Sequence, residues 1–159
     1  MRAHRVLRAG WLPAGMVFLF ITAFDPWPTE ARADHHEARC LALSMYWEAR
    51  DAGRDGMAAV GWVVLNRVAH PEFPDDVCAV VQDGGETPPC QFSWWCDGKS
   101  DEPDDRVSWR LASAVADELL TDPGADPTRN ALLFHNAAVD PRWPALERVA
   151  EIGTHVFHR

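Results

Sequence analysis

Glu48 is the residue in this sequence best suited to acid–base chemistry. It stands near the end of a predicted helix, directly after Trp47, and seven residues after Leu41, so it falls on the inner edge of that helix. A lone carboxylate is unfavourable to bury, so a glutamate placed there is expected to be paired or functional. Aromatic neighbours such as Tyr46 and Trp47 would exclude water and raise its pKa, which a general acid needs near neutral pH.

Polar and aromatic side chains alternate in a short stretch that follows a loop rich in Gly and Pro. Amide and hydroxyl groups can form hydrogen bonds with the polar groups of a substrate, and a flat indole ring can stack on a substrate face. We therefore predict that Gln91, Ser93 and Trp94 bind substrate, with packing in the core as the alternative for Trp94. His135 and Asn136 end a predicted strand and are expected to line the same cleft.

Other polar residues are expected to be structural. We predict that Arg50 forms a salt bridge with Asp51 or Asp55. Asn66 and Arg67 lie near the end of a predicted apolar helix and are expected to cap it or tie it to a loop. His155 and His158, at the ends of the last predicted strand, are expected to be structural or solvated.

Four cysteines, an even number, point to two disulfides in an exported domain. Three pairings are possible. Cys90 and Cys96 form a natural local pair, which leaves Cys40 for Cys78. No two of these cysteines have the C-x-x-C spacing of zinc sites, so we expect neither a metal nor a cofactor.

The elements that must position these residues are mostly helices. Apolar residues at helical spacing predict helices from Cys40 to about Gly53, Asp55 to about Ala69, Val77 to Val81, and about Asp104 to Leu120. Their inner stripes are expected to be Met57, Val60, Val64 and Val68 in the second helix, and Val107, Leu111, Val115 and Leu119 in the last. Short apolar runs at 131–134, 148–152 and 155–157 predict a small antiparallel sheet. The predicted class is α+β, mainly helical.

Residues 1–33 have the pattern of a secretory signal peptide: a basic head, an apolar run and the cleavage sequence Ala31-Arg32-Ala33. An uncleaved anchor is the alternative, but the run is short for a membrane span and is interrupted by Pro13. Cleavage after Ala33 leaves residues 34–159 as one domain, expected to be exported to the periplasm or cell envelope without stable membrane insertion. A monomer is the simplest expectation.

The charge of the chain excludes some classes of partner. The formal net charge is −9, and removing the four arginines and two acidic residues of the leader leaves −11. Such a surface repels phosphate backbones, so we expect no nucleic acid ligand.

Six sequence blocks, in one order over about residues 39 to 158, resemble those of the SleB-type cell wall hydrolases. They are Trp47-Glu48-Ala49-Arg50, Gly56-Met57-x-Ala59-Val60, Val63-Val64-Leu65-Asn66-Arg67-Val68, Phe73-Pro74-Asp75-x-Val77-Cys78-x-Val80-Val81, Cys90-Gln91-Phe92-Ser93 and Ile152-Gly153-x-His155-x-Phe157. One departure is present. The family usually continues Glu-Ala-Arg with Gly and an acidic residue, whereas this chain has Asp51-Ala52.

The resemblance implies a lysozyme-like domain that cuts the β-1,4 bond between N-acetylmuramic acid and N-acetylglucosamine in peptidoglycan glycan strands. Members act mostly as lytic transglycosylases, with the glutamate matching Glu48 as general acid and then base, and with 1,6-anhydro ends as products. Two alternatives are a muramidase that uses water, with Asp51, Asp55 or Asp97 as its base, and a peptidoglycan-binding module without catalysis.

Overall fold

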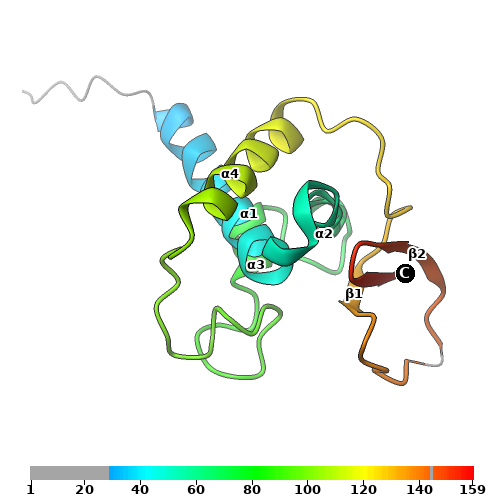
Figure 1. Cartoon of the computed structure of the whole chain (residues 1–159). Coiled ribbons are helices and arrows are strands. Elements are labelled where there is room, and N and C mark those ends of the chain that lie inside the picture. Colours follow the sequence, from blue (N-terminus) through cyan, green and yellow to red (C-terminus); the bar gives the residue numbers. More distant parts are fainter. Residues whose placement is uncertain (1–28, 144) are drawn as a thin grey trace, which may run out of the picture.

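The described part of this computed structural model comprises residues 29–143 and 145–159, and within it helices outweigh strands (Figure 1). In chain order the elements are α1 (Thr29–Ala49), the 3₁₀ turn η1 (Arg50–Ala52), α2 (Gly53–Val68), α3 (Val77–Val81), α4 (Arg106–Thr121), β1 (Leu133–Asn136), β2 (Arg148–Ile152) and β3 (His155–His158). The predicted α+β class, mainly helical with a small antiparallel sheet, is confirmed.

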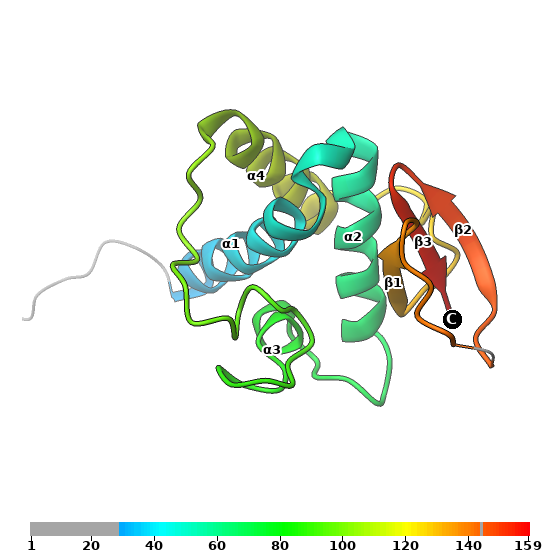
Figure 2. The same cartoon turned by 60° about the horizontal axis from the view of Figure 1, so that its bottom comes forward.

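Helix α2 is the central helix. Figure 2 shows α1 and α4 on one side of it and the three strands on the other. Met57, Val60 and Val64 are fully buried, as their spacing predicts. Gly61 lets α1 and α4 pack closely against α2. A Cβ at position 61 would lie 2.6 Å from Cδ1 of Leu119 in α4 and 2.9 Å from the sulfur of Met45 in α1. A small residue at this position is therefore required by the packing.

The sheet has the strand order β1-β3-β2, and both pairs are antiparallel. Because side chains alternate along a strand, each strand offers one face to α2 and one to the opposite side. Phe134 and Phe157 pack toward Ala59 and Val63 of α2 in a second small core cluster. His135 and Val156 are register partners on the opposite face.

Helix α1 begins earlier than its predicted start at Cys40. Residues 34–37 are helical. The carboxylate of Glu37 accepts a hydrogen bond of 2.7 Å from the backbone N–H of Val77, so contact with the start of α3 holds this extension. The predicted cleavage point after Ala33 lies within α1, and the rest of the predicted leader, residues 1–28, lies outside the described residues. Within the described ranges, the helices are too short or too polar to span a membrane.

The predicted inward position of Val107 in α4 is wrong, since this side chain is 70% exposed. The buried stripe consists of Ala112, Val115, Ala116 and Leu119. At 100° per residue, Val107 lies about 140° around the helix from Ala112, so it faces solvent. Asp105 caps the helix by accepting a hydrogen bond from the N–H of Val107 at 2.8 Å.

Two disulfides connect the cysteines in the pairing favoured by their spacing. Cys40–Cys78 links α1 to α3. Cys90–Cys96 closes the local loop that carries Gln91 and Ser93.

Candidate active site

Glu48 lies in the last turn of α1, beside a cavity of about 390 Å³. One wall of this cavity, called the Glu48 pocket below, comes from the end of α1 and from η1, and the other comes from the sheet. Its lining residues are Trp47, Glu48, Ala49, Arg50, Asp51, Ala52, Asn136, Thr154 and His155. The helix end and the sheet thus meet at the residue that the sequence singles out.

Small residues bring the sheet close to the helix end. Gly153, in the β2–β3 turn, has φ of +59°, and a Cβ added to it would lie 3.3 Å from the Cβ of Ala52. On the other side of Ala52, a Cβ on Gly56 would lie only 2.3 Å away. Position 52, where the resemblance leads one to expect an acidic side chain, is therefore a packing contact between η1, α2 and the turn.

Burial raises the pKa of Glu48 from 4.5 to about 7. The positive charge of Arg67 acts in the opposite direction and is the smaller effect. With its pKa near neutrality, the carboxyl group is available in both its protonated and its ionised form. This is the state that a group serving in turn as acid and base requires.

Arg67 is buried and interacts electrostatically with Glu48. Its Nε donates a 2.8 Å hydrogen bond to the carbonyl of Leu132, and its guanidinium lies 5.3 Å from the ring centre of Phe73 and 5.5 Å from that of Phe92. Burial lowers its pKa to about 10, while Asp83 and Glu48 oppose this shift. Arg67 ties α2 to the start of β1 and to the disulfide loop, and this confirms its predicted structural role.

Asn66 makes a similar connection. Its side-chain amide donates 3.1 Å hydrogen bonds to the carboxylate of Asp126 and to the carbonyl of Ala131. The segment leading into β1 is thereby fixed against α2, as predicted, and β1 in turn places Asn136 at the Glu48 pocket.

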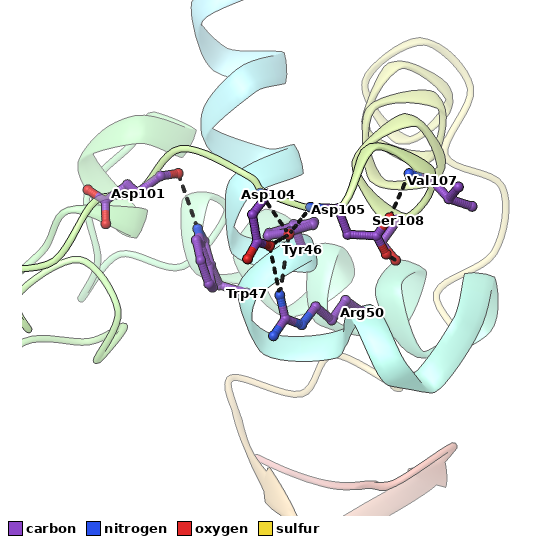
Figure 3. Close-up of polar contacts among 8 residues, drawn as sticks. All are labelled: Tyr46, Trp47, Arg50, Asp101, Asp104, Asp105, Val107 and Ser108. Atoms are coloured by element: carbon purple, nitrogen blue, oxygen red, sulfur yellow. Dashed lines mark hydrogen bonds and ion pairs between the residues drawn. The ribbon is translucent and has the colours of Figure 1, made fainter.

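Tyr46 fastens the end of α1 to the segment preceding α4 (Figure 3). Its hydroxyl donates a 2.6 Å hydrogen bond to Asp104 and accepts from the backbone N–H groups of Asp104 and Asp105 at 3.2 and 3.0 Å. The indole N–H of Trp47 donates to the carbonyl of Asp101 at 3.3 Å. Tyr46 and Trp47, the two residues directly before Glu48 in α1, are therefore held in place.

The predicted partner of Arg50 is wrong. Arg50 forms its ion pair with Asp104, at 3.4 Å, rather than with Asp51 or Asp55. Its guanidinium also lies 5.5 and 5.6 Å from the ring centres of Tyr46 and Trp47. The aromatic neighbours draw the arginine toward α4, where Asp104 is fixed by the same tyrosine.

The structure separates the two predicted binding residues of β1. Asn136 lines the Glu48 pocket, whereas His135 lines a different cavity of about 300 Å³ on the opposite face of the sheet. Nε2 of His135 lies 3.1 Å from Nε2 of His158, and the ring of Trp143 meets both imidazoles edge-on. Adjacent residues of a strand point to opposite faces, so the expectation that both line one cleft is wrong.

The disulfide loop does not line the Glu48 pocket. Gln91 and Ser93 are exposed and lie outside the set of pocket residues, with Phe92 buried between them. Trp94 is only 8% exposed and belongs to the core, which is the alternative expected for this residue. Trp94 lines a small cavity of about 100 Å³ whose wall includes Trp47.

The sequence interpretation missed two pocket residues, Thr154 and His155, of which His155 is the titratable one. It is 5% exposed and lines the Glu48 pocket. Burial lowers its pKa, while hydrogen bonding to the backbone of Glu48 opposes the shift, so the neutral form of the imidazole is favoured. Its register partner on β1 is Asn136, and this pairing, combined with strand alternation, is the signal that could have found it.

A metal site is offered by one group among the described residues: His36 with Cys40 and Cys78. Both sulfurs are joined in a disulfide, so they lack the thiolate form that binds metal.

Comparison with known proteins identifies the family. The sequence profile described as Cell Wall Hydrolase matches residues 51–158. This match begins three residues after Glu48, which therefore lies outside it.

Relatives are found among curated sequences and solved structures. The spore cortex-lytic enzymes of Bacillus subtilis (strain 168) and Halalkalibacterium halodurans are 29% identical over 126 residues and 31% identical over 125, each match spanning 77% of this chain. These matches span only 37% and 34% of the relatives' own length.

Two solved catalytic domains have similar structures. The catalytic domain of the Bacillus cereus SleB protein has a TM-score of 0.60 and 26% identity, covering 79% of this chain and 91% of that domain. The catalytic domain of the germination-specific lytic transglycosylase SleB from Bacillus anthracis has a TM-score of 0.59 and 26% identity, with 77% and 93% covered. The predicted lysozyme-like fold is thereby confirmed.

Proposed function

The chain belongs to the Cell Wall Hydrolase family, and on that premise we propose that it cleaves the β-1,4 bond between N-acetylmuramic acid and N-acetylglucosamine in peptidoglycan. We propose further that it does so as a lytic transglycosylase, with Glu48 as the catalytic residue. The similarity to the SleB catalytic domains, one of which is named a lytic transglycosylase, supports peptidoglycan cleavage and the transglycosylase reaction.

In the first step, protonated Glu48 gives its proton to the glycosidic oxygen as the bond from that oxygen to the muramoyl C1 breaks. The N-acetylglucosamine part leaves with a new hydroxyl group, and positive charge develops at C1 and the ring oxygen. Glu48 is then an ionised carboxylate close to that charge.

In the second step, the C6 hydroxyl of the same muramoyl residue attacks C1 while Glu48 removes its proton. The product is a 1,6-anhydro ring, no water is consumed, and Glu48 regains its starting state. Asn136, Thr154 and His155 line the pocket where the sugar would lie, and Asn136 supplies an amide suited to an N-acetyl or hydroxyl group.

One observation carries this proposal: the carboxyl group of Glu48 has a pKa raised to about 7 and lies beside a cavity large enough for a sugar residue. The test is digestion of purified sacculi by the wild-type protein and by Glu48→Gln, followed by mass spectrometry of the soluble products. We expect 1,6-anhydro ends from the wild type and none from the variant. Full activity in the variant would refute the role of Glu48.

A muramidase that uses water is the second candidate, because Asp51 lines the same pocket as Glu48. A hydrolase needs a second carboxylate about 5 to 9 Å from the acid. Soluble products that have reducing ends and no anhydro rings would favour this candidate, if the Asp51→Asn variant no longer releases them. A peptidoglycan-binding module without catalytic activity would instead bind to sacculi and release no fragments from them.

A substrate in the cell wall agrees with the secretory leader predicted at residues 1–33. We therefore propose that the protein is exported and acts in the periplasm or cell envelope. The spore role in the names of the relatives belongs to those proteins and forms no part of this proposal.

A further inference from the structure

We propose that Arg50 binds a carboxylate carried by the muramoyl residue of the substrate, and so distinguishes muramoyl from N-acetylglucosaminyl units at the Glu48 pocket. This inference rests on the proposed function, because it assumes that a glycan strand occupies that pocket.

The structure fixes one end of the guanidinium and leaves the other edge available. The hydrogen bonds and the ion pair of Arg50 found among the described residues all use Nη1, which bonds to the Tyr46 hydroxyl at 3.3 Å and to Asp104 at 3.4 Å. Figure 3 shows the rest of the guanidinium directed away from both partners. Nε and Nη2 therefore present two parallel N–H donors, the geometry that binds a carboxylate in a bidentate manner.

This donor edge is oriented before any ligand arrives. The guanidinium lies over the rings of Tyr46 and Trp47, and the Tyr46 hydroxyl also holds Asp104 at 2.6 Å. A long arginine side chain normally loses conformational freedom when it binds a ligand, and much of that loss has already occurred here.

The position of Arg50 suits recognition next to the reacting bond. It lines the Glu48 pocket, two residues after Glu48, and its side chain remains 40% exposed. Among the described residues that line this pocket it is the one arginine or lysine, and burial favours the neutral form of His155. Glu48 and Asp51 would repel an anion, so a carboxylate would be drawn to the Arg50 side of the pocket.

Muramoyl residues differ from N-acetylglucosaminyl residues by a lactyl arm that ends in a carboxyl group. In peptide-free strands that carboxylate is free, and in peptide-bearing strands the attached stem peptide supplies carboxylates instead. The shared ligand chemistry is a carboxylate on the muramoyl arm, and the experiment separates its two sources.

The test measures binding to soluble glycan strands by proteins that carry Glu48→Gln, so that cleavage is not needed. Three probes are used: peptide-free strands with free lactyl carboxylates, the same strands with those groups converted to methylamides, and peptide-bearing strands. The proteins are Glu48→Gln alone and its combinations with Arg50→Gln, Arg50→Lys and Arg54→Gln. Arg54 is a matched control, since it is an exposed arginine that pairs with Glu118 away from the pocket lining.

We expect the parent to bind the carboxylate strands about tenfold more tightly than the methylamide strands, as one charge-assisted contact at the pocket rim would give. Arg50→Gln should reduce this ratio to about one, Arg50→Lys should restore part of it, and Arg54→Gln should leave it unchanged. A parent preference for peptide-bearing strands over the methylamide strands, lost in Arg50→Gln, would identify stem-peptide carboxylates as a second source.

An unchanged ratio in Arg50→Gln would overturn the proposal, as would equal weakening toward both peptide-free probes, which indicates a structural role. Absence of strand binding would overturn it too. Digestion of sacculi by the wild type tests the proposed function separately. If the protein shows the expected binding ratio but releases no fragments, the carboxylate site is supported and the proposed cleavage is refuted.

Discussion

The hydroxyl of Tyr46 lies 2.6 Å from Oδ1 of Asp104, although 58 residues separate them in the chain. Tyr46 precedes Glu48 by two residues and is fully buried. The same hydroxyl accepts hydrogen bonds from two backbone N–H groups, so the final turn of α1 and the segment before α4 share one buried polar centre. The loop that follows the disulfide is thereby fixed beside the Glu48 pocket.

Tyr46→Phe should lower the free energy of unfolding by about 0.5–1.5 kcal/mol, because it removes the hydroxyl that accepts hydrogen bonds from the part-buried backbone N–H groups of Asp104 and Asp105. Urea unfolding monitored by tryptophan fluorescence measures this change. Ser113→Ala is the control, since that hydroxyl bonds only to a carbonyl one turn earlier in its own helix. Equal effects in the two variants would show that the buried centre contributes no special stability.

The raised pKa of Glu48 predicts the pH dependence of catalysis. A general acid must be protonated, so kcat/KM should fall as pH rises through about 7. Initial rates of glycan cleavage between pH 5 and 9 measure this limb. If the enzyme is a transglycosylase, the Asp51→Asn variant should show the same decrease in kcat/KM as pH rises through about 7. Activity that keeps rising above pH 8 would contradict the assignment of Glu48 as the acid.

The same pKa also predicts how stability changes with pH. The folded protein holds the proton of Glu48 up to about pH 7, whereas the unfolded chain releases it near pH 4.5. Stability contributed by this group is therefore present at low pH and decreases as pH rises from 4.5 to 7. The difference amounts to about 3 kcal/mol, at about 1.4 kcal/mol per pKa unit.

Glu48→Gln cannot ionise, so it should gain stability relative to the wild type between pH 4.5 and 8. Denaturant unfolding of both proteins at these two pH values tests this, because other titrating groups cancel in the comparison. A wild-type-to-variant difference that does not change with pH would show that the carboxyl is not desolvated.

The sequence predicts the fold well where a single periodicity decides the outcome. The stripe of Met57, Val60 and Val64 identifies a central helix, and cysteine spacing gives both disulfides. Val107 fails because a spacing of four residues drifts around the helix, which leaves Val107 about 140° from the buried Ala112. Cys40 fails as a helix start because Glu37 gains a partner, the N–H of Val77, that no local pattern reveals.

The site is harder to predict because its residues come from distant segments. Glu48 and Asn136 were identified from local context, yet their meeting depends on the contact between Ala52 and Gly153. Arg50 pairs with Asp104 rather than a nearby aspartate, since Tyr46 holds that carboxylate in place. Long-range partners of this kind leave no spacing signal in the chain.

Asn136→Ala should lower kcat/KM for glycan cleavage by about tenfold, because it removes an amide that lines the Glu48 pocket. His135→Ala is the matched neighbour on the opposite face of the sheet, where it contacts His158 and Trp143, so its rate should stay within about twofold. Kinetics on the same soluble strands compare the two variants. A larger loss for His135→Ala would move the binding surface to the other face of the sheet.

The two disulfides should contribute unequally to stability, because they close loops of different length. Cys40–Cys78 has a sequence separation of 38 and links α1 to α3, whereas Cys90–Cys96 has a separation of 6. Loop-closure entropy then gives about 4 kcal/mol for the first and about 2 kcal/mol for the second.

We expect the double variant Cys40→Ala with Cys78→Ala to unfold at a much lower urea concentration than Cys90→Ala with Cys96→Ala. Both variants make the same chemical change, so each serves as the control for the other. Equal losses would show that strain or residual structure in the unfolded chain, rather than loop length, sets the contribution of each disulfide.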